Sequence, residues 1–156
     1  MDRIQISKDF PDCFYRVTVK GLCVRDGKLL MIRESEGLNG GKWELPGGGL
    51  DFGNDVKTDF SREVDEEMGL TVAKMSERPF YVWTWRYENR RNIDWFYTCV
   101  LAYRVEFNHL NITPSEECEE IKFFSKEEIK DLKLSGQMTP LPDYFNPEDF
   151  TEPFSI

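Results

Sequence analysis

The chain has 156 residues, 40% of them hydrophobic and 31% charged, which fits one globular domain with one core over residues 1–156. A net charge of −9 argues against a protein that coats nucleic acids, because such a surface needs a basic excess. The sequence has no apolar run long enough to span a bilayer and begins with a charged segment, so we expect a cytoplasmic protein with no membrane partner.

The first predicted elements are strands. Over residues 14–24, Val17 and Val19 are set against Arg16, Thr18 and Lys20 in the period-two pattern of a half-buried strand. Asp26-Gly27 then predicts a tight hairpin turn into a second strand over 29–32. A glycine-containing loop over 34–41 and a short strand over 43–45 follow.

The period changes at residues 54–68, which predict a helix. Val56, Phe60, Val64 and Met68 recur every four residues and mark one apolar face. Asn54 is the expected N-cap, and Gly69 is the expected residue that ends the helix.

The second half of the chain predicts a long hairpin and a late helix. Residues 80–107 are rich in aromatic and β-branched residues and are interrupted at 88–92, and 121–124 form one more strand. Ser125 and Glu128 form a capping box that opens a helix carrying Ile129 and Leu132. Residues 135–156, rich in proline and aromatics, predict an irregular arm that packs over the domain, crosses a dimer or frays. The whole pattern predicts an α/β domain with a mixed sheet.

The residue types available limit the chemistry. Cys13, Cys23, Cys99 and Cys118 form no CxxC pair, which favours reduced, packed thiols over a zinc site or disulfides. His109 is the only histidine, so we expect a carboxylate as any general base.

The predicted helix carries its acids in an unfavourable place. Asp59, Glu63, Glu66 and Glu67 fall on one stripe beside the apolar face, where they repel one another. Glu66 and Glu67 also lie in the last turn, where the helix dipole disfavours anions. The alternative is an ordinary solvated acidic face, but this placement favours binding of Mg²⁺ or Mn²⁺.

A glycine-rich loop over residues 46–53 precedes the helix. It lacks the Gly-Lys-Ser/Thr ending of a P-loop and the spacing of a dinucleotide-binding loop. Its glycines let a ligand or ion approach the main chain, although a plain turn would use them too.

Loop and helix together resemble the Nudix box, which runs Gly, five residues, Glu, seven residues, then Arg-Glu-U-x-Glu-Glu-x-Gly-U with U apolar. The positions that match in register are Gly48, Arg62, Glu63, Val64, Glu66, Glu67, Gly69 and Leu70. Asn54 is the departure, since it stands where the family has its first glutamate. The resemblance implies the Nudix-type α/β/α sandwich and a pyrophosphohydrolase of nucleotide-like substrates.

The resemblance also implies a metal site. Its ligands would be Glu63, Glu66, Glu67 and the main-chain carbonyl of Gly47, with Mg²⁺ or Mn²⁺ as cofactor. The family takes its general base from the box or from a later loop, so Glu66 is the first candidate, and Glu117 and Glu120 from the acidic run 116–120 are the second. That run could also be a solvated loop.

Arg62 is implied to orient the box carboxylates. Asn54 cannot pair with Arg62 as a glutamate would, and Asp51 or Asp55 could compensate. If the departure is a weakening, Asn54→Glu raises activity or metal affinity; a fall would mean that Asn54 has a role of its own.

The substrate stays open among nucleoside triphosphates, dinucleoside polyphosphates and nucleotide sugars. Trp83, Trp85 and Tyr87 on the predicted hairpin could stack on a nucleobase, or could instead belong to the core or a homodimer interface. Candidate phosphate contacts, each of which could instead be an ordinary surface cation, are Arg33, Lys42, Arg90 and Arg91. A second hypothesis is a Nudix-fold sensor that binds a nucleotide with little or no turnover.

Overall fold

The computed structural model describes residues 13–35, 40–87 and 95–154. The strands are β1 (Cys13–Leu22), β2 (Val24–Arg25), β3 (Lys28–Arg33), β4 (Trp43–Glu44), β5 (Gly47–Gly49), β6 (Val72–Met75), β7 (Tyr81–Tyr87), β8 (Trp95–Phe107) and β9 (Glu120–Phe124). The α-helices are α1 (Val56–Met68), α2 (Lys126–Ile129) and α3 (Leu141–Tyr144), with 3-10 turns η1 (Gly136–Met138) and η2 (Pro147–Phe150).

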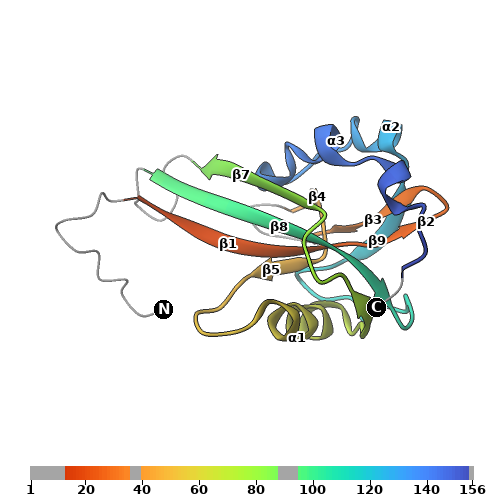
Figure 1. The fold of residues 1–156 in the computed structure, drawn as a ribbon, viewed down its shortest axis with the longest axis horizontal. Coiled ribbons are helices and arrows are strands. Elements are labelled where there is room, and N and C mark those ends of the chain that lie inside the picture. The colour runs from red at the N-terminus through yellow and green to blue at the C-terminus, as the bar shows by residue number, and fades with distance from the viewer. Residues whose placement is uncertain (1–12, 36–39, 88–94, 155–156) are drawn as a thin grey trace.

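The strands form two sheets. In the first, β1 and β8 run parallel at the centre, β5 pairs antiparallel with β1, and β7 and β6 pair antiparallel with β8. In the second, β3 pairs antiparallel with β2, β4 and β9. The mixed sheet expected from the sequence is therefore confirmed. Helix α1 lies on one side of the strands and α2 and α3 lie on the other, which gives an α/β/α arrangement (Figure 1).

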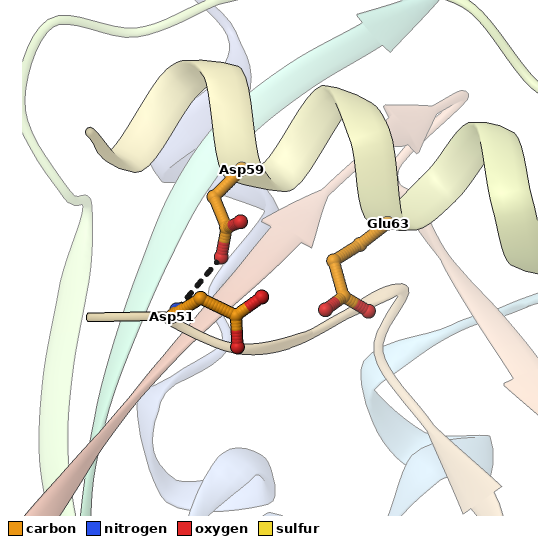
Figure 2. Close-up of side chains that lie close together, drawn as sticks. All are labelled: Asp51, Asp59 and Glu63. Atoms are coloured by element: carbon orange, nitrogen blue, oxygen red, sulfur yellow. Dashed lines mark hydrogen bonds between the residues drawn. The ribbon is translucent and has the colours of Figure 1, made fainter. Parts of the chain in front are cut away.

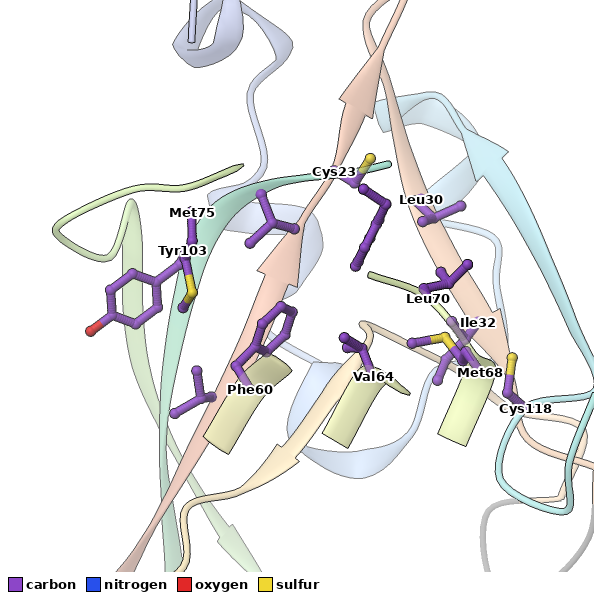
Figure 3. Packing of buried hydrophobic residues seen from close by; sticks show 13 residues of the cluster. Cys23, Leu30, Ile32, Phe60, Val64, Met68, Leu70, Met75, Tyr103 and Cys118 are labelled. Carbon is purple, nitrogen blue, oxygen red and sulfur yellow. The ribbon is translucent and has the colours of Figure 1, made fainter. Parts of the chain in front are cut away.

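Each helical layer covers its own hydrophobic cluster. Phe60, Val64 and Met68 of α1 pack against residues of β1, β3 and β8, including Val19, Leu30, Ile32 and Val105 (Figure 3). On the other side, Leu22 and Leu29 share a second cluster with Met138, Leu141, Phe145 and Phe150. The C-terminal segment thus packs over the domain, and the irregular arm expected there contains the short helices η1, α3 and η2.

The turn and helix signals of the sequence are borne out with two exceptions. Asp26 and Gly27 both have positive φ, at 51° and 76°, as the tight hairpin requires. Gly69 ends α1 in the left-handed region at φ 70°. The predicted N-cap was wrong by one residue, since Asp55 rather than Asn54 accepts the hydrogen bond from the Thr58 amide. The capping box of Ser125 and Glu128 is present, but α2 ends at Ile129, before Leu132.

The sequence missed two strands and misjudged one face of β1. It assigned 47–49 to a loop, but β5 pairs with β1, and it did not predict β6. Thr18 and Lys20, expected opposite the core, are buried, because the side of β1 that they share with Leu22 is covered by β4 and the C-terminal segment. Among the described residues, no helix is long and apolar enough to cross a membrane.

Candidate active site

The segment between β5 and α1 folds back beneath the helix and brings three acids together. Figure 2 shows Asp59 and Glu63 pointing from α1 toward Asp51 in this loop. One carboxylate oxygen of each lies within 4.8 Å of those of the other two. Three carboxylates at this spacing need a cation among them.

Arg62 supplies that cation. Its Nη2 lies 2.7 Å from Asp59 Oδ1, 2.9 Å from Asp51 Oδ2 and 3.5 Å from Glu63 Oε1. Its Nη1 donates to Glu66 Oε2 at 2.9 Å. These carboxylates hold the pKa of the guanidinium above its ordinary value, with the hydrogen bond to Asp59 as the main cause. Arg62 therefore makes the contacts that an orienting role requires. One of them is with Asp51, which the sequence analysis named as a possible substitute for the missing glutamate.

Asp59 is the buried member of this network, with a side chain that is 2% exposed. Burial raises the pKa of its carboxyl, but hydrogen bonds from Arg62, Asn54 and the Asp51 amide outweigh burial and leave the pKa below its ordinary value. Asp59 is therefore an ionised, fully partnered carboxylate inside the protein.

Glu67 and Glu63 form a second acidic pair further along α1. Burial, a hydrogen bond with Glu63 and the charges of Glu63 and Glu117 raise the pKa of Glu67 to about 9, although Lys20 opposes the shift. Glu67 thus keeps its proton to a higher pH than an ordinary glutamate when no metal is bound, and a divalent cation would favour its ionised form.

Gly48 of β5 borders this pair. A Cβ built on Gly48 would lie 2.7 Å from Glu63 Oε2 and 3.1 Å from Glu63 Cδ. Glycine is thus what lets β5 approach the Glu63 carboxylate so closely.

Lys20 reaches the same loop from β1. Its Nζ donates to the carbonyl oxygen of Gly47 at 2.8 Å and to that of Leu45 at 3.2 Å, and lies 3.3 Å from Glu44 Oε1. Ser135 Oγ donates to Glu44 Oε2, which ties this buried ion pair to the C-terminal segment. The network fixes the main chain just before β5.

These residues fit the divalent cation that the resemblance implies. Mg²⁺ and Mn²⁺ prefer oxygen ligands, and Glu63 and Glu67 offer partly buried carboxyl oxygens, with Glu67 able to give up its proton to a cation. The Gly47 carbonyl oxygen accepts one hydrogen bond from Lys20 and keeps its second lone pair. The triad of Asp51, Asp59 and Glu63 is a poorer place for the ion, because Arg62 already bridges it.

The other expected acids lie at different points around the site. Glu66 is largely exposed and paired with Arg62. Glu117 is exposed and near enough to influence Glu67, and its amide donates to Ser115 Oγ, which itself donates to the Glu67 carbonyl. Glu120 instead lies across from Arg33 on the neighbouring strand.

Some of the cationic and aromatic residues predicted to bind substrate make contacts within the protein instead. Arg33 Nη2 lies 3.3 Å from Glu119 and 3.4 Å from Glu120, so its charge is balanced within the protein. Trp83 is 4% exposed and donates to the Gln137 carbonyl, which makes it a core residue beneath the C-terminal segment and not a stacking surface. For Trp83 the structure thus bears out the core alternative given for these aromatics in the sequence analysis.

Trp85 and Tyr87 lie further along β7 and are half-buried. A Cβ built on Gly136 would lie 3.3 Å from Trp85 Nε1 and 3.1 Å from Tyr87 Cε1, so both rings border η1. Substrate binding by these two residues stays a prediction. Lys42 is partly buried, and Arg90 and Arg91 lie outside the described residues.

The sequence analysis missed Lys20 and Glu44 as residues of the site. Both residues are only 3% exposed, and they are 24 positions apart in the chain. The available signal was a lysine in the middle of an otherwise apolar stretch, 19–24, which calls for a buried partner.

Comparison with known proteins agrees with this geometry. The family model described as "NUDIX domain" matches residues 14–145, which is most of the chain. The chain belongs to the NUDIX domain family. The resemblance of residues 48–70 to the Nudix box is thereby confirmed, and the fold expected from it as well.

Individual relatives cover different parts of the chain. A MutT-like protein of Streptomyces ambofaciens is 46% identical over 59 residues, which are 37% of this chain and 36% of the relative. A putative 8-oxo-dGTP diphosphatase 3 of Mycobacterium tuberculosis is 32% identical over 106 residues, 68% of this chain and 48% of the relative. The chain thus spans about half or less of the length of these Nudix relatives.

Solved structures share the Nudix fold at lower identity. The crystal structure of a MutT NUDIX hydrolase from Burkholderia pseudomallei superposes with a TM-score of 0.66 and 21% identity, covering 85% of this chain and 99% of that one. This likeness concerns the arrangement of strands and helices, which this chain shares with that structure.

Proposed function

We propose that this protein is a Mg²⁺-dependent pyrophosphohydrolase that cleaves a phosphoanhydride bond in a nucleotide. The observation that carries the proposal is the pairing of Glu63 and Glu67 beside Gly48, with the pKa of Glu67 raised to about 9. Two adjacent, partly buried acids do not stabilise the metal-free fold, whereas a divalent cation that binds a diphosphate needs such oxygen ligands.

The residues that would hold the cation are Glu63, Glu66, Glu67 and the carbonyl oxygen of Gly47. When bound, such a cation neutralises phosphate charge and lowers the pKa of a coordinated water. Arg62 holds Glu66 by a hydrogen bond of 2.9 Å and lies beside Glu63, so it fixes two of the carboxylates in place.

A carboxylate would take the proton from the attacking water. Glu66 remains the first candidate, and its hydrogen bond with Arg62 holds it beside the box carboxylates. Of the second pair, Glu117 is favoured over Glu120, because Glu117 lies near Glu67 while Glu120 pairs with Arg33.

The substrate class proposed first is a nucleoside triphosphate. One relative with 32% identity is named as a putative 8-oxo-dGTP diphosphatase, which makes purine deoxynucleoside triphosphates the first compounds to assay. Dinucleoside polyphosphates and nucleotide sugars come next, because the same site chemistry serves any nucleoside diphosphate linked to a further group.

Release of phosphate or pyrophosphate, measured with and without Mg²⁺ across these three classes, tests the proposal. We expect Mg²⁺-dependent product from one class. Absence of product from every class, with nucleotides still raising the melting temperature, would replace the hydrolase with the sensor hypothesis.

A further inference from the structure

Both oxygens of the buried Asp59 carboxylate are used. Oδ1 accepts from Arg62 Nη2 at 2.7 Å and from Asn54 Nδ2 at 2.9 Å, and Oδ2 accepts from the Asp51 amide at 3.1 Å. A charge at 2% exposure needs this complete set of donors to remain ionised. Asp59 is therefore built into the site and is not a solvated surface acid.

The partner at position 54 must be a donor. An ionised carboxylate only accepts hydrogen bonds, so Asn54 presents its Nδ2 to Asp59. The glutamate that the Nudix box carries at this position would bring a second carboxylate against Asp59. Asparagine at 54 and aspartate at 59 are thus chemically matched to each other.

Asp59 also determines where the Arg62 guanidinium lies. The same Nη2 that binds Asp59 lies 3.5 Å from Glu63 Oε1, and Nη1 of the same planar group donates to Glu66 at 2.9 Å. Because the guanidinium is rigid, anchoring Nη2 on a buried carboxylate fixes this nitrogen beside Glu63 and directs Nη1 toward Glu66.

We propose that Asp59 is a positioning residue which, together with Asn54, takes the place of the missing first glutamate of the box. It anchors Arg62 from inside the protein, and Arg62 then orients Glu63 and Glu66 toward the cation. The orientation toward a cation rests on the proposed function, whereas the contacts of Asp59 do not. It reverses the expectation that Asn54→Glu strengthens the site.

The test is a double-variant cycle of Asn54→Glu and Asp59→Ala, with Asp65→Ala on the exposed face of α1 as the matched control. Two readouts need no turnover: the melting temperature in EDTA, and the affinity for Mn²⁺ alone measured by electron paramagnetic resonance. They remain informative if the wild-type protein hydrolyses none of the nucleotides, so failure of the proposed function is seen separately.

We expect Asp59→Ala to lower the melting temperature by roughly 5–15 °C, because Asn54 Nδ2 and the Asp51 amide lose their acceptor and Arg62 loses its buried partner. Mn²⁺ binding should weaken about 10-fold or more, the usual effect of removing a residue that orients metal ligands. Asn54→Glu alone lowers the melting temperature because two carboxylates then meet. Asp65→Ala leaves both readouts near those of the wild type.

The double variant decides between positioning and simple loss of packing. The carboxylate introduced at position 54 replaces the one removed at position 59, so we expect the pair to recover most of the stability and of the Mn²⁺ affinity. Additive damage in the double variant, or unchanged Mn²⁺ affinity in Asp59→Ala, would overturn the inference. If Asp59→Ala does not fold, Asp59→Asn replaces it, because it keeps the side-chain volume. The same two quantities, melting temperature and Mn²⁺ affinity, are then compared.

Discussion

At the residue scale, Glu67 is an acid whose surroundings make its ionised form unfavourable and so lower the stability of the metal-free fold. Its carboxyl is partly buried beside Glu63 and Glu117, and Lys20 compensates only part of their charge. Ionising it without a metal ion is therefore unfavourable in the folded protein and unhindered in the unfolded chain. We propose that the acid is retained because it binds the cation, since active sites commonly keep residues that lower stability.

This gives a stability prediction with a definite sign. The pKa of Glu67 is about 9 in the folded state and about 4.5 ordinarily, so between these pH values the folded state binds more protons. The free energy of unfolding of the metal-free protein should therefore fall as pH rises through this window. Glu67→Gln removes that contribution and should be the more stable protein at pH 8 in EDTA. Urea unfolding at several pH values checks this, and parallel pH profiles for the two proteins would refute it.

The sequence could predict those site residues whose spacing is local. Arg62, Glu63, Glu66 and Glu67 lie within two turns of one helix, so helical geometry alone places them together. Lys20 and Glu44 could not be paired in this way, because β1 and β4 meet only through tertiary structure. For Asn54 the sequence showed a departure but not its partner, since Asp59 is buried only after the β5–α1 loop has folded back.

At the element scale, the site depends on how closely β5 approaches α1. Strand β5 consists of three glycines, a residue that disfavours strands, so the sequence predicted a loop there. Pairing with β1 overrides that preference and places Gly48 against Glu63. Helix α1, by contrast, was predictable because its apolar period and its Gly69 terminator are local signals.

Gly48→Ala should separate metal binding from folding. The added methyl group meets only the end of the flexible Glu63 side chain, which can swing away, so we expect the melting temperature to change by a few degrees at most. Mn²⁺ affinity should fall, about 10-fold or more, because Glu63 is displaced from the site. Gly49→Ala is the control, since its methyl group meets the end of Arg16 instead. Equal Mn²⁺ affinity in the two variants would argue against a ligand role for Glu63.

At the scale of the whole molecule, the two hydrophobic cores on opposite sides of the strands support different parts of the site. The cluster under α1 supports the helix that carries the box, and the cluster under the C-terminal segment supports β7 and the Lys20–Glu44 pair. The sequence could not predict η1, α3 and η2, because helices this short form only through tertiary contacts. The aromatic residues of the segment did indicate packing, and Phe145 and Phe150 are buried as a result.

We propose above all that Glu67 binds the cation required for hydrolysis. The most direct measurement compares Mg²⁺-dependent turnover of the best nucleotide substrate by the wild type, by Glu67→Gln and by the control Asp65→Asn. We predict that Glu67→Gln remains folded but loses several orders of magnitude in kcat, while Asp65→Asn retains wild-type turnover. Turnover by Glu67→Gln at the wild-type rate would contradict it.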